Sequence, residues 1–412
     1  MRMAMRFGME MEREIGVDWA ELPPEIIEII SKSLIIYGDY LRFRAVCRNW
    51  RSPVPKTPNH LPPQLPWLML PLHHCPTYQS RRAFFDLSNN RTHFLNLPEA
   101  SHRRRNCGSS HGWLVILDDT PEILLVNPLT RAKVHLPSLC TFPSVINFNY
   151  SDVGREYVLR NYVGQLYTLN LRQMRNSYIK KIILSSSPLQ SNEFTALAIL
   201  THTGNLAFCK NGDQSWTLID EQAQYHWEDA VYHNGLFYAV NKRGLIAVCD
   251  VKGLLPPRVS IIDAPGCVDG DLQYLVFSGE ELLLVIRYLE PQYDDMVGDS
   301  NLVYRTVGFS VFKMNWNMPE WLKIETLGDR MLFIGENSSL SLSASDFSGC
   351  SGDCIYYTDD YSESNYDGAF EKHDLGIYRL WDQIIDSLPC YPRNTYTRLG
   401  GPSPVWVSPN PC

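Results

Sequence analysis

The strongest helical pattern in the chain lies between residues 17 and 52, where apolar residues recur at steps of three and four. This spacing predicts a helix with a broad apolar face, and Pro23 and Pro24 suit its first turn, where a missing N–H has no consequence. Gly38 and Asp39 are expected to interrupt this helix and to begin a second one. Because a unit of about 40 residues cannot bury a self-sufficient core, its apolar surface is expected to contact either the rest of the chain or a partner.

From Trp67 onward the pattern changes to short apolar strands and turns with Gly or Asn, which predicts antiparallel hairpins. The turn glycines Gly204, Gly235 and Gly279 lie 31 residues (204 to 235) and 44 residues (235 to 279) apart. Propeller blades typically span about 40–50 residues, and radial closure protects strand edges, so a propeller is favoured over a large β-sandwich. Residues 381–389 are expected to form at most two helical turns. Strands are expected within 111–128, 194–210, 227–250, 272–290, 333–346, 354–361 and 376–380.

Six prolines fall within residues 53–66, which predicts a stiff, extended linker that sets the distance between two domains. The fold class expected is therefore mainly β, with a small α-helical unit followed by a β-propeller-like domain. The parts are a disordered leader at 1–16, the helical unit at 17–52, the linker at 53–66 and the β domain at 67–410.

Composition narrows the classes of function. The net charge of −8 gives no overall attraction to nucleic acid or acidic membranes, so neither is expected as a partner. The first 14 residues lack the apolar run of a secretory signal, and no run of 18 apolar residues is present. The 11 scattered cysteines predict reduced thiols and a location in the nucleus or the cytoplasm.

Two groups of motifs carry a resemblance to known families. Asp18-Trp19, Leu22-Pro23 and the run VCRNWR (46–51) are similar to the opening and close of an F-box. The rest of the chain resembles the β-propeller-type domain of plant F-box proteins of the KIB and SKP-interacting-partner group. The matching stretches are LPWLML (65–70), CGSSHGWLVI (107–116), NPLTRAKVHLP (127–137), EDAVYHNGLFYAV (228–240), SLSASDFSGCSGDCIYYTDD (341–360), LGIYRL (375–380) and PSPVWVSP (402–409).

The resemblance implies a substrate receptor of an SCF-type ubiquitin ligase, without catalysis or cofactor of its own. The F-box would dock on a Skp-type adaptor linked to a cullin scaffold, and the propeller would hold the target protein. An incompletely covered apolar face on a small helical unit suits such a contact with the adaptor. The alternative is that all apolar residues of this unit belong to its own internal core. The candidate adaptor-binding residues are Leu22, Pro23, Ile26, Ile27, Ile30, Leu34, Leu41, Val46, Cys47 and Trp50.

One stretch departs from the F-box pattern. Ile35, Ile36, Tyr37 and Tyr40 stand where charged residues or serine are common. They either tune the choice of adaptor or pack on the propeller.

Other clusters point to sites only weakly. Cys350 and Cys354 lack a second ligand pair at similar spacing, which favours buried thiols over zinc. The adjacent residues 73–75 (HHC) would point to opposite faces of a strand and cannot chelate together. The basic run Arg103–Arg105 suggests nuclear import or nucleic acid, but a solvated loop is favoured because three charges are few in an acidic chain.

An enzyme is disfavoured, because the chain has no G-x-S-x-G, H-E-x-x-H, P-loop or G-x-G-x-x-G motif. The acidic pairs Asp359-Asp360 and Glu290 with Asp294-Asp295 are expected in loops. A propeller acting on its own as a scaffold or an enzyme, with a vestigial F-box, is the alternative function. Aromatic residues are the better hint for target binding, although blade-core positions are favoured for most of them. They are Trp216, Tyr225, His226, Trp227, Tyr232 and Tyr288.

Overall fold

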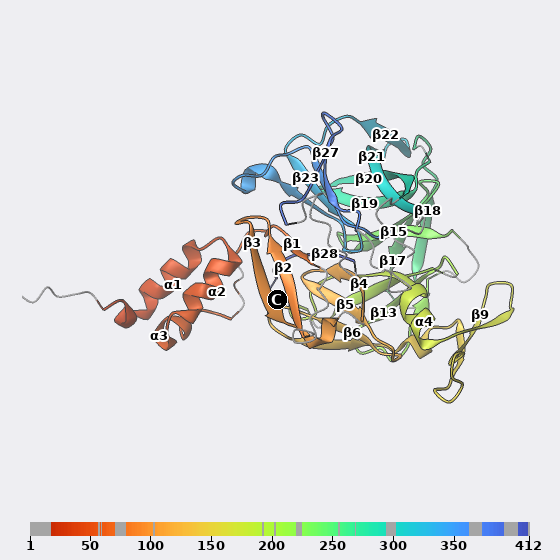
Figure 1. The fold of residues 1–412 in the computed structure, drawn as a ribbon, viewed down its shortest axis with the longest axis horizontal. Helices are drawn as coiled ribbons and strands as arrows, with labels where there is room; N and C mark the ends of the chain where they lie inside the picture. Colours follow the sequence, from red (N-terminus) through yellow and green to blue (C-terminus); the bar gives the residue numbers. More distant parts are fainter. Residues whose placement is uncertain are drawn as a thin grey trace, which may run out of the picture. The chain divides into compact units, whose positions relative to one another are not determined.

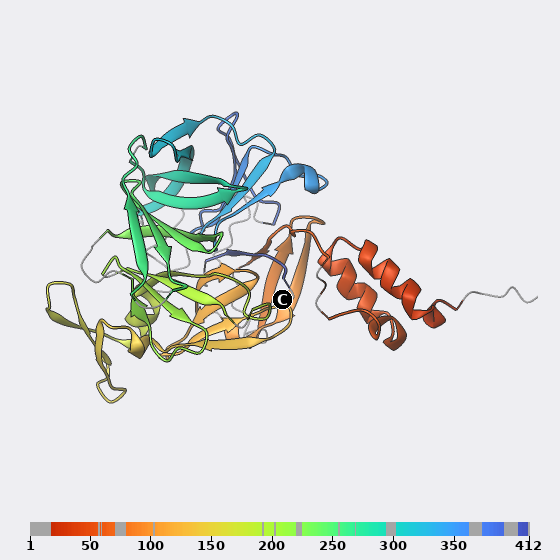
Figure 2. The same ribbon diagram turned by 180° about the vertical axis from the view of Figure 1, so that it is seen from behind.

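The computed structural model divides the chain into two compact units, Met1–Gln64 and Leu65–Cys412. Figures 1 and 2 show helices in the first unit, drawn in red-orange, and mainly strands in the second. The predicted leader at 1–16 lies outside the described residues. The structure describes residues 18–56, 58, 60–70, 80–101, 104–191, 193–201, 203–219, 225–253, 256–267, 269–293, 302–361, 373–390 and 403–410.

The helical unit differs from the predicted pattern in where its helices begin and end. The break falls at Leu34, whose N–H donates to the carbonyl of Ser31, and not at Gly38. Gly38 and Asp39 lie in the first turn of the second helix, where no intrahelical N–H bond is required and an acidic residue is favourable. The predicted second helix divides, because Cys47 is extended and caps a short third helix. The elements are η1 (Trp19–Glu21), α1 (Pro24–Ser33), α2 (Tyr37–Ala45) and α3 (Arg48–Arg51).

The proline-rich segment packs along these helices. Residues 53–64, which we call the strap, fall within the helical unit. The hydroxyl of Tyr40 donates to the carbonyl of Pro55 at 2.6 Å, and the amide of Gln64 donates to the carbonyl of Ile35 at 2.9 Å. Prolines lack an N–H but keep a carbonyl acceptor, so helix side chains can hold such a segment. The described residues of this segment therefore contact the helices, which the prediction of a linker did not include.

The second unit contains six sheets that form a ring, numbered here along the chain. Sheet 1 consists of β28 (Val405–Val407), β1 (Trp67–Met69), β2 (Arg81–Asp86) and β3 (Arg91–Asn96). Sheet 2 consists of β4 (Arg105–Ser110), β5 (Trp113–Leu117), β6 (Ile123–Val126) and β7 (Lys133–Leu136). Sheet 3 consists of β11 (Ile179–Leu184), β12 (Thr195–Leu200), β13 (Leu206–Lys210) and β14 (Thr217–Leu218).

Sheets 4 to 6 complete the ring. Neighbouring strands are antiparallel, except that β23 and β25 are parallel. Sheet 4 consists of β15 (Trp227–His233), β16 (Leu236–Asn241), β17 (Ile246–Asp250) and β18 (Arg258–Ile262). Sheet 5 consists of β19 (Leu272–Ser278), β20 (Glu281–Tyr293), β21 (Leu302–Asn315) and β22 (Glu320–Ile324). Sheet 6 consists of β24 (Leu340–Ser343), β23 (Arg330–Ile334), β25 (Cys354–Tyr357), β26 (Gly376–Arg379) and β27 (Ile385–Asp386).

Six apolar clusters join each sheet to the next and establish the ring. The last cluster joins sheets 6 and 1, where the rings of Phe333 and Trp406 lie 5.3 Å apart. Middle strands such as β5 and β12 are buried along their whole length, so each sheet needs a neighbour on both faces. The mainly β, propeller-type fold is confirmed, and within the described residues the ring has six blades.

The ring closes on a strand from the other end of the sequence. β28 pairs with β1, with Trp406 opposite Leu68. Sheet 1 therefore combines one strand from the end of the β unit with three from its beginning. Gly204, Gly235 and Gly279 all have positive φ, as expected of turn glycines. Residues 381–389, where at most two helical turns were expected, contain no helix and include β27.

A three-stranded sheet lies outside the ring, and the sequence pattern did not indicate it. It consists of β8 (Val145–Phe148), β9 (Tyr157–Arg160) and β10 (Leu166–Leu169), and α4 (Leu171–Ser177) follows it. Three further 3-10 turns are η3 (Pro98–Ala100), η4 (Leu139–Thr141) and η5 (Ala344–Asp346).

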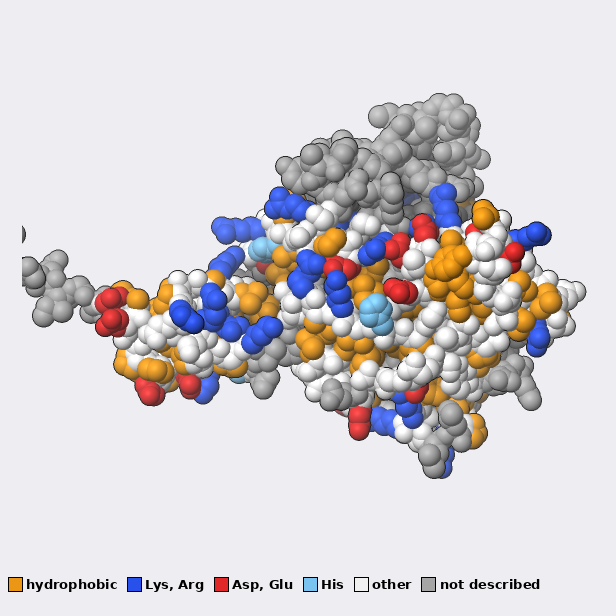
Figure 3. Space-filling view, turned by 90° about the horizontal axis from the view of Figure 1, so that it is seen from below, with side chains coloured by type: hydrophobic (Ala, Val, Ile, Leu, Met, Phe, Trp, Pro, Cys, Tyr) orange, Lys and Arg blue, Asp and Glu red, His pale blue; other side chains and the backbone are white. Residues whose placement is uncertain are grey.

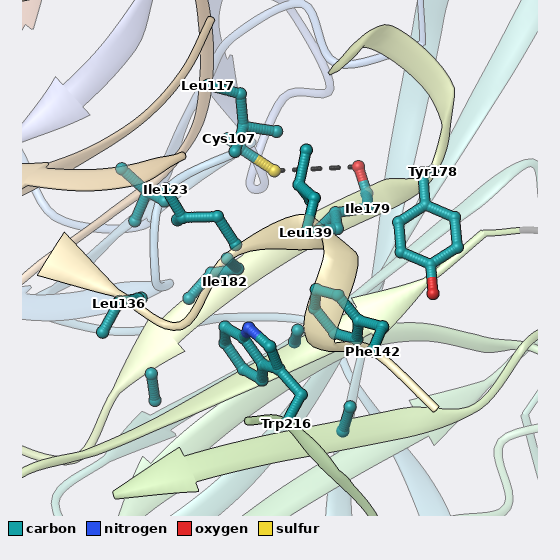
Figure 4. Close-up of a cluster of buried hydrophobic side chains, with 14 of the residues drawn as sticks. Cys107, Leu117, Ile123, Leu136, Leu139, Phe142, Tyr178, Ile179, Ile182 and Trp216 are labelled. Carbon is teal, nitrogen blue, oxygen red and sulfur yellow. Dashed lines mark hydrogen bonds between the residues drawn. The ribbon is translucent and has the colours of Figure 1, made fainter. Parts of the chain in front are cut away.

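Aromatic residues fill the joint between sheets 2 and 3. Figure 4 shows Phe142 facing Trp216, and their rings are stacked 4.6 Å apart. The indole N–H of Trp216 donates to the carbonyl of Pro137 at 2.8 Å. Trp216, considered above for target binding, is thus a core residue, and Trp227 is also buried.

Candidate adaptor-binding site and the centre of the propeller

Side-chain hydrogen bonds tie the two ends of the helical unit together. The indole N–H of Trp50 donates to the carbonyl of Trp19 at 2.7 Å, and the amide of Asn49 donates to the carbonyl of Ala20 at the same distance. The ring of Trp50 also lies 4.6 Å from that of Phe43. The F-box-like opening and close of the sequence are therefore in direct contact.

The buried core of this unit is small. Ile27 is fully buried, and Tyr37, Tyr40 and Phe43 from α2 are buried with it. Ile27, one of the candidate adaptor-binding residues, belongs to this core and not to the exposed surface. Tyr37 and Tyr40 belong to the stretch that departs from the F-box pattern, and both are core residues of the helical unit.

Apolar side chains cover much of the outside of the same unit. Ile26 and Ile29 stand one turn apart on α1, on the side opposite Ile27. We call the six strongly exposed members, which are between 42% and 64% exposed, the apolar face. Figure 3 shows hydrophobic side chains on the surface of the helical unit. Its residues are Trp19, Ile26, Ile29, Ile35, Ile36 and Val46.

The other candidate residues divide between exposed and half-buried positions. Pro23, Ile26 and Val46 are exposed. The half-buried ones are Leu22, Ile30, Leu34, Leu41, Cys47 and Trp50. The candidate set omitted Trp19, Ile29, Ile35 and Ile36, although Ile29 follows Ile26 by one helical turn and Trp19 is part of the F-box-like opening. Such a surface can bind a partner by apolar burial.

The centre of the propeller contains a buried ion pair that several blades share. The buried ammonium of Lys181 donates to the carboxylate of Asp229 at 2.5 Å. The second oxygen of Asp229 accepts from the backbone N–H of Leu275 at 3.0 Å and from the hydroxyl of Ser339 at 3.3 Å. One carboxylate thus connects strands of sheets 3, 4 and 5 with the loop between β23 and β24.

That loop, residues 335–339, crosses the middle of the ring. The N–H of Ser338 donates to the carbonyl of Ser109 at 2.7 Å, although sheet 1 lies between their two sheets. The half-buried Glu336 lies near Arg105 and Lys181. Burial raises the pKa of Glu336 to about 7, although the two cations oppose the shift.

Asp359 and Asp360 follow β25 outside any helix or strand, as expected, but they belong to a second buried network. The fully buried Arg287 donates to Asp360 at 3.0 Å and to Asp374 at 2.8 Å. Burial works against its charge, but Tyr274 and the two carboxylates raise the pKa of Arg287 above its ordinary value. Asp360 is therefore a structural counter-ion. Of the other acidic set, Glu290 lies in β20 and not in a loop, and Asp294 and Asp295 lie outside the described residues.

The remaining candidates have structural positions. Arg105 is not in a solvated loop: it lies in β4, and its guanidinium donates to the carbonyl of Ile179 at 2.6 Å. Cys354 begins β25 and is buried. Residues 73–75 and Arg103 lie outside the described residues. Within the described ranges, no group of three or more His, Cys, Asp or Glu could hold a metal ion, and no helix is long and apolar enough to cross a membrane.

A small helical unit with an apolar face, followed by a β-propeller, defines an F-box protein with a propeller domain. Residues 84–379 match the model of the KIB1-4 beta-propeller family, and the chain belongs to that family. It is 28% identical to F-box protein SKIP23 of Arabidopsis thaliana, over 95% of this chain and 96% of the relative. It is also 25% identical to F-box protein At2g17036 of the same plant, over 95% of each chain. The chain is a plant F-box protein of the KIB type.

Proposed function

We propose that this protein is the substrate receptor of an SCF-type ubiquitin ligase. The apolar face of the helical unit binds a Skp-type adaptor, which connects to a cullin scaffold. The propeller binds the target protein, and ubiquitin transfer belongs to other subunits. The chain then acts by raising the effective concentration of the target near the transfer machinery.

The observation that carries this proposal is the apolar face itself. Six large apolar side chains are strongly exposed on a unit whose core contains few residues. Large exposed apolar patches on soluble proteins mark interaction sites, because leaving them in water is unfavourable. The names of the relatives as F-box proteins support an adaptor as the partner.

The pairing of two acids at the centre of the propeller with buried cations supports a binding role over catalysis. The acids Asp229 and Asp360 are both engaged with buried cations. Their role is to hold blades together, which leaves the surface loops to recognise a target. A target of the propeller would be a protein whose degradation requires the intact helical unit.

The test measures the affinity of the full chain for a purified Skp-type adaptor by calorimetry. The double variant Ile26→Asp/Ile29→Asp should weaken binding by at least about 30-fold, the loss typical of an interface hot spot. Its thermal unfolding should remain close to that of the wild type, because both side chains are exposed.

The matched control is Lys32→Asp, which also lies on α1 and changes the net charge by the same two units. This variant should bind the adaptor almost as tightly as the wild type. Full adaptor affinity in the double variant would rule out the apolar face as the docking site.

A further inference from the structure

The three-stranded sheet β8–β10 is an addition to a ring that closes without it. Its inner face packs on the joint between sheets 2 and 3, where Tyr157, Leu159 and Leu169 are buried. Both ribbon views show it projecting from the ring, in yellow (Figures 1 and 2). None of its strands pairs with a ring sheet among the described residues. The sheet is therefore available for a role other than closing the propeller.

Exposed apolar side chains concentrate in the strands and the two hairpin turns of this sheet. Six large apolar residues that are between 44% and 86% exposed fall within residues 146–166. Single exposed apolar residues need no explanation, but such a concentration marks an interaction site. These residues are Ile146, Tyr150, Val153, Tyr162, Val163 and Leu166.

The turns that carry these side chains are held by hydrogen bonds. The carboxylate of Glu156 accepts from the N–H of Gly154 at 2.9 Å and from that of Leu171 at 3.2 Å. The N–H of Asn161 donates to the carbonyl of Gln165 at 2.9 Å. The exposed surface is thus built on ordered backbone.

The free edge of β10 has backbone groups ready for another strand. The N–H of Arg160 donates to the carbonyl of Ser144, on the β8 side of β9. Arg160 and its partner Leu166 are therefore a non-hydrogen-bonded pair of β9 and β10, and by alternation so are Val158 and Thr168. Leu166 and Thr168 consequently direct their N–H and carbonyl groups away from β9, toward the open edge.

β10 is short, with four residues, but it carries none of the other devices that blunt an edge. Natural edge strands are usually protected by Lys, Pro or a bulge. β10 (LYTL) contains no charge or proline, and its register with β9 is unbroken, whereas β8 has an irregularity between Val145 and Asn147. The accessible edge is therefore that of β10.

The charges beside this edge indicate what kind of segment fits it. Arg155 and Arg160 are exposed, and neither forms an ion pair within the described part of the chain. The nearby Glu156 is committed to backbone N–H groups, which lower its pKa. A second copy of this chain would bring the same cations together, so self-pairing is disfavoured.

We propose that the edge of β10 binds an extended segment of another protein by β-strand addition, and that this segment alternates apolar with acidic residues. Main-chain bonds to Leu166 and Thr168 would supply the pairing. The exposed apolar side chains and Arg160 would select the sequence. This site is separate from the apolar face of the helical unit, and its existence does not depend on adaptor binding.

The test uses the full chain and two fluorescent ten-residue peptides, one alternating valine with glutamate and one alternating valine with lysine. The glutamate peptide should bind at least about 10-fold more tightly by fluorescence anisotropy, and raised salt should weaken it. Thr168→Pro should abolish this binding, because it removes an outward N–H without breaking the β9–β10 ladder. Thr168→Val keeps the N–H and should bind like the wild type.

Four results would overturn the proposal. They are no binding of the glutamate peptide, equal or tighter binding of the lysine peptide, unchanged binding by a folded Thr168→Pro variant, and concentration-dependent dimers of the free chain that Thr168→Pro abolishes. Sedimentation of the free chain detects the last of these, which would make a second copy the occupant. Thermal unfolding of the proline variant establishes that it is folded.

Discussion

The indole of Trp50 reaches across the helical unit and donates a hydrogen bond to the backbone carbonyl of Trp19. This bond joins the last helix to the turn that precedes α1, and Trp19 is a member of the apolar face. The shape of this end of the helical unit therefore depends on a contact between residues 31 positions apart.

Replacing Trp50 with Phe should loosen this turn. The variant loses the N–H donor but keeps an aromatic ring against Phe43, so the expected loss is about 1 kcal/mol, the usual net value of one hydrogen bond. Amide exchange of residues 19–22 in the full chain should become faster. Trp381→Phe, at an exposed tryptophan of the propeller unit, is the control and should leave that exchange unchanged.

Replacing Tyr40 with Phe should release the strap. The hydroxyl of Tyr40 holds the carbonyl of Pro55, and the ring itself is fully buried. We expect faster hydrogen exchange in residues 53–64 and a loss of about 1 kcal/mol in the stability of the helical unit. If exchange in the strap stays at the wild-type rate, this bond does not hold it.

Replacing Arg287 with Met should destabilise the propeller by about 3–5 kcal/mol, because Asp360 and Asp374 would be left as buried, unpaired charges. Urea unfolding measures the loss. Arg258→Met, at an exposed arginine of β18, removes the same charge and should change stability by less than about 0.5 kcal/mol. Equal losses in the two variants would contradict a structural role for the buried network.

Replacing Glu336 with Gln should flatten the pH dependence of stability. The folded-state pKa of about 7 lies above the ordinary value of a carboxyl group. The folded protein therefore holds a proton that the unfolded chain releases, so the wild type loses stability as pH rises toward 7 and keeps the deficit above it.

The groups facing this carboxyl are Arg105, Lys181, Asp359 and Asp360. Thermal unfolding should show the advantage of Glu336→Gln growing from pH 5 to pH 8. The exposed Glu290→Gln makes the same charge change and should have no such trend. An advantage that is equal at both pH values would point to packing and not to ionisation.

The strand pattern could be predicted because each ring hairpin carries its own signal. Turn glycines such as Gly235 need positive φ, and the flanking strands β15 and β16 are rich in apolar and aromatic residues. The sheet β8–β10 was missed because its strands have four residues each and mix exposed apolar with polar positions. Such short segments resemble loops in sequence.

The exposed apolar surface of the helical unit could be predicted in part. Helical spacing places Ile26 and Ile27 on the same helix, but only the structure separates the exposed Ile26 from the buried Ile27. The strap and the partners of Arg287 could not be predicted, because they depend on contacts between distant residues. The carboxylate of Asp374, for example, follows Arg287 by 87 positions.

The pairing of β28 with β1 also means that the ring can close only late in the synthesis of the chain. β1 leaves the ribosome more than 300 residues before Val405, an interval of roughly 20–70 s at common synthesis rates of about 5–20 residues per second. During that time the edge of β1 that β28 will cover has no permanent partner. The growing chain therefore passes through a stage in which an exposed strand edge is available for chaperones to bind. A premature stop codon before β28 would leave the ring open, and we expect such a product to be degraded rapidly.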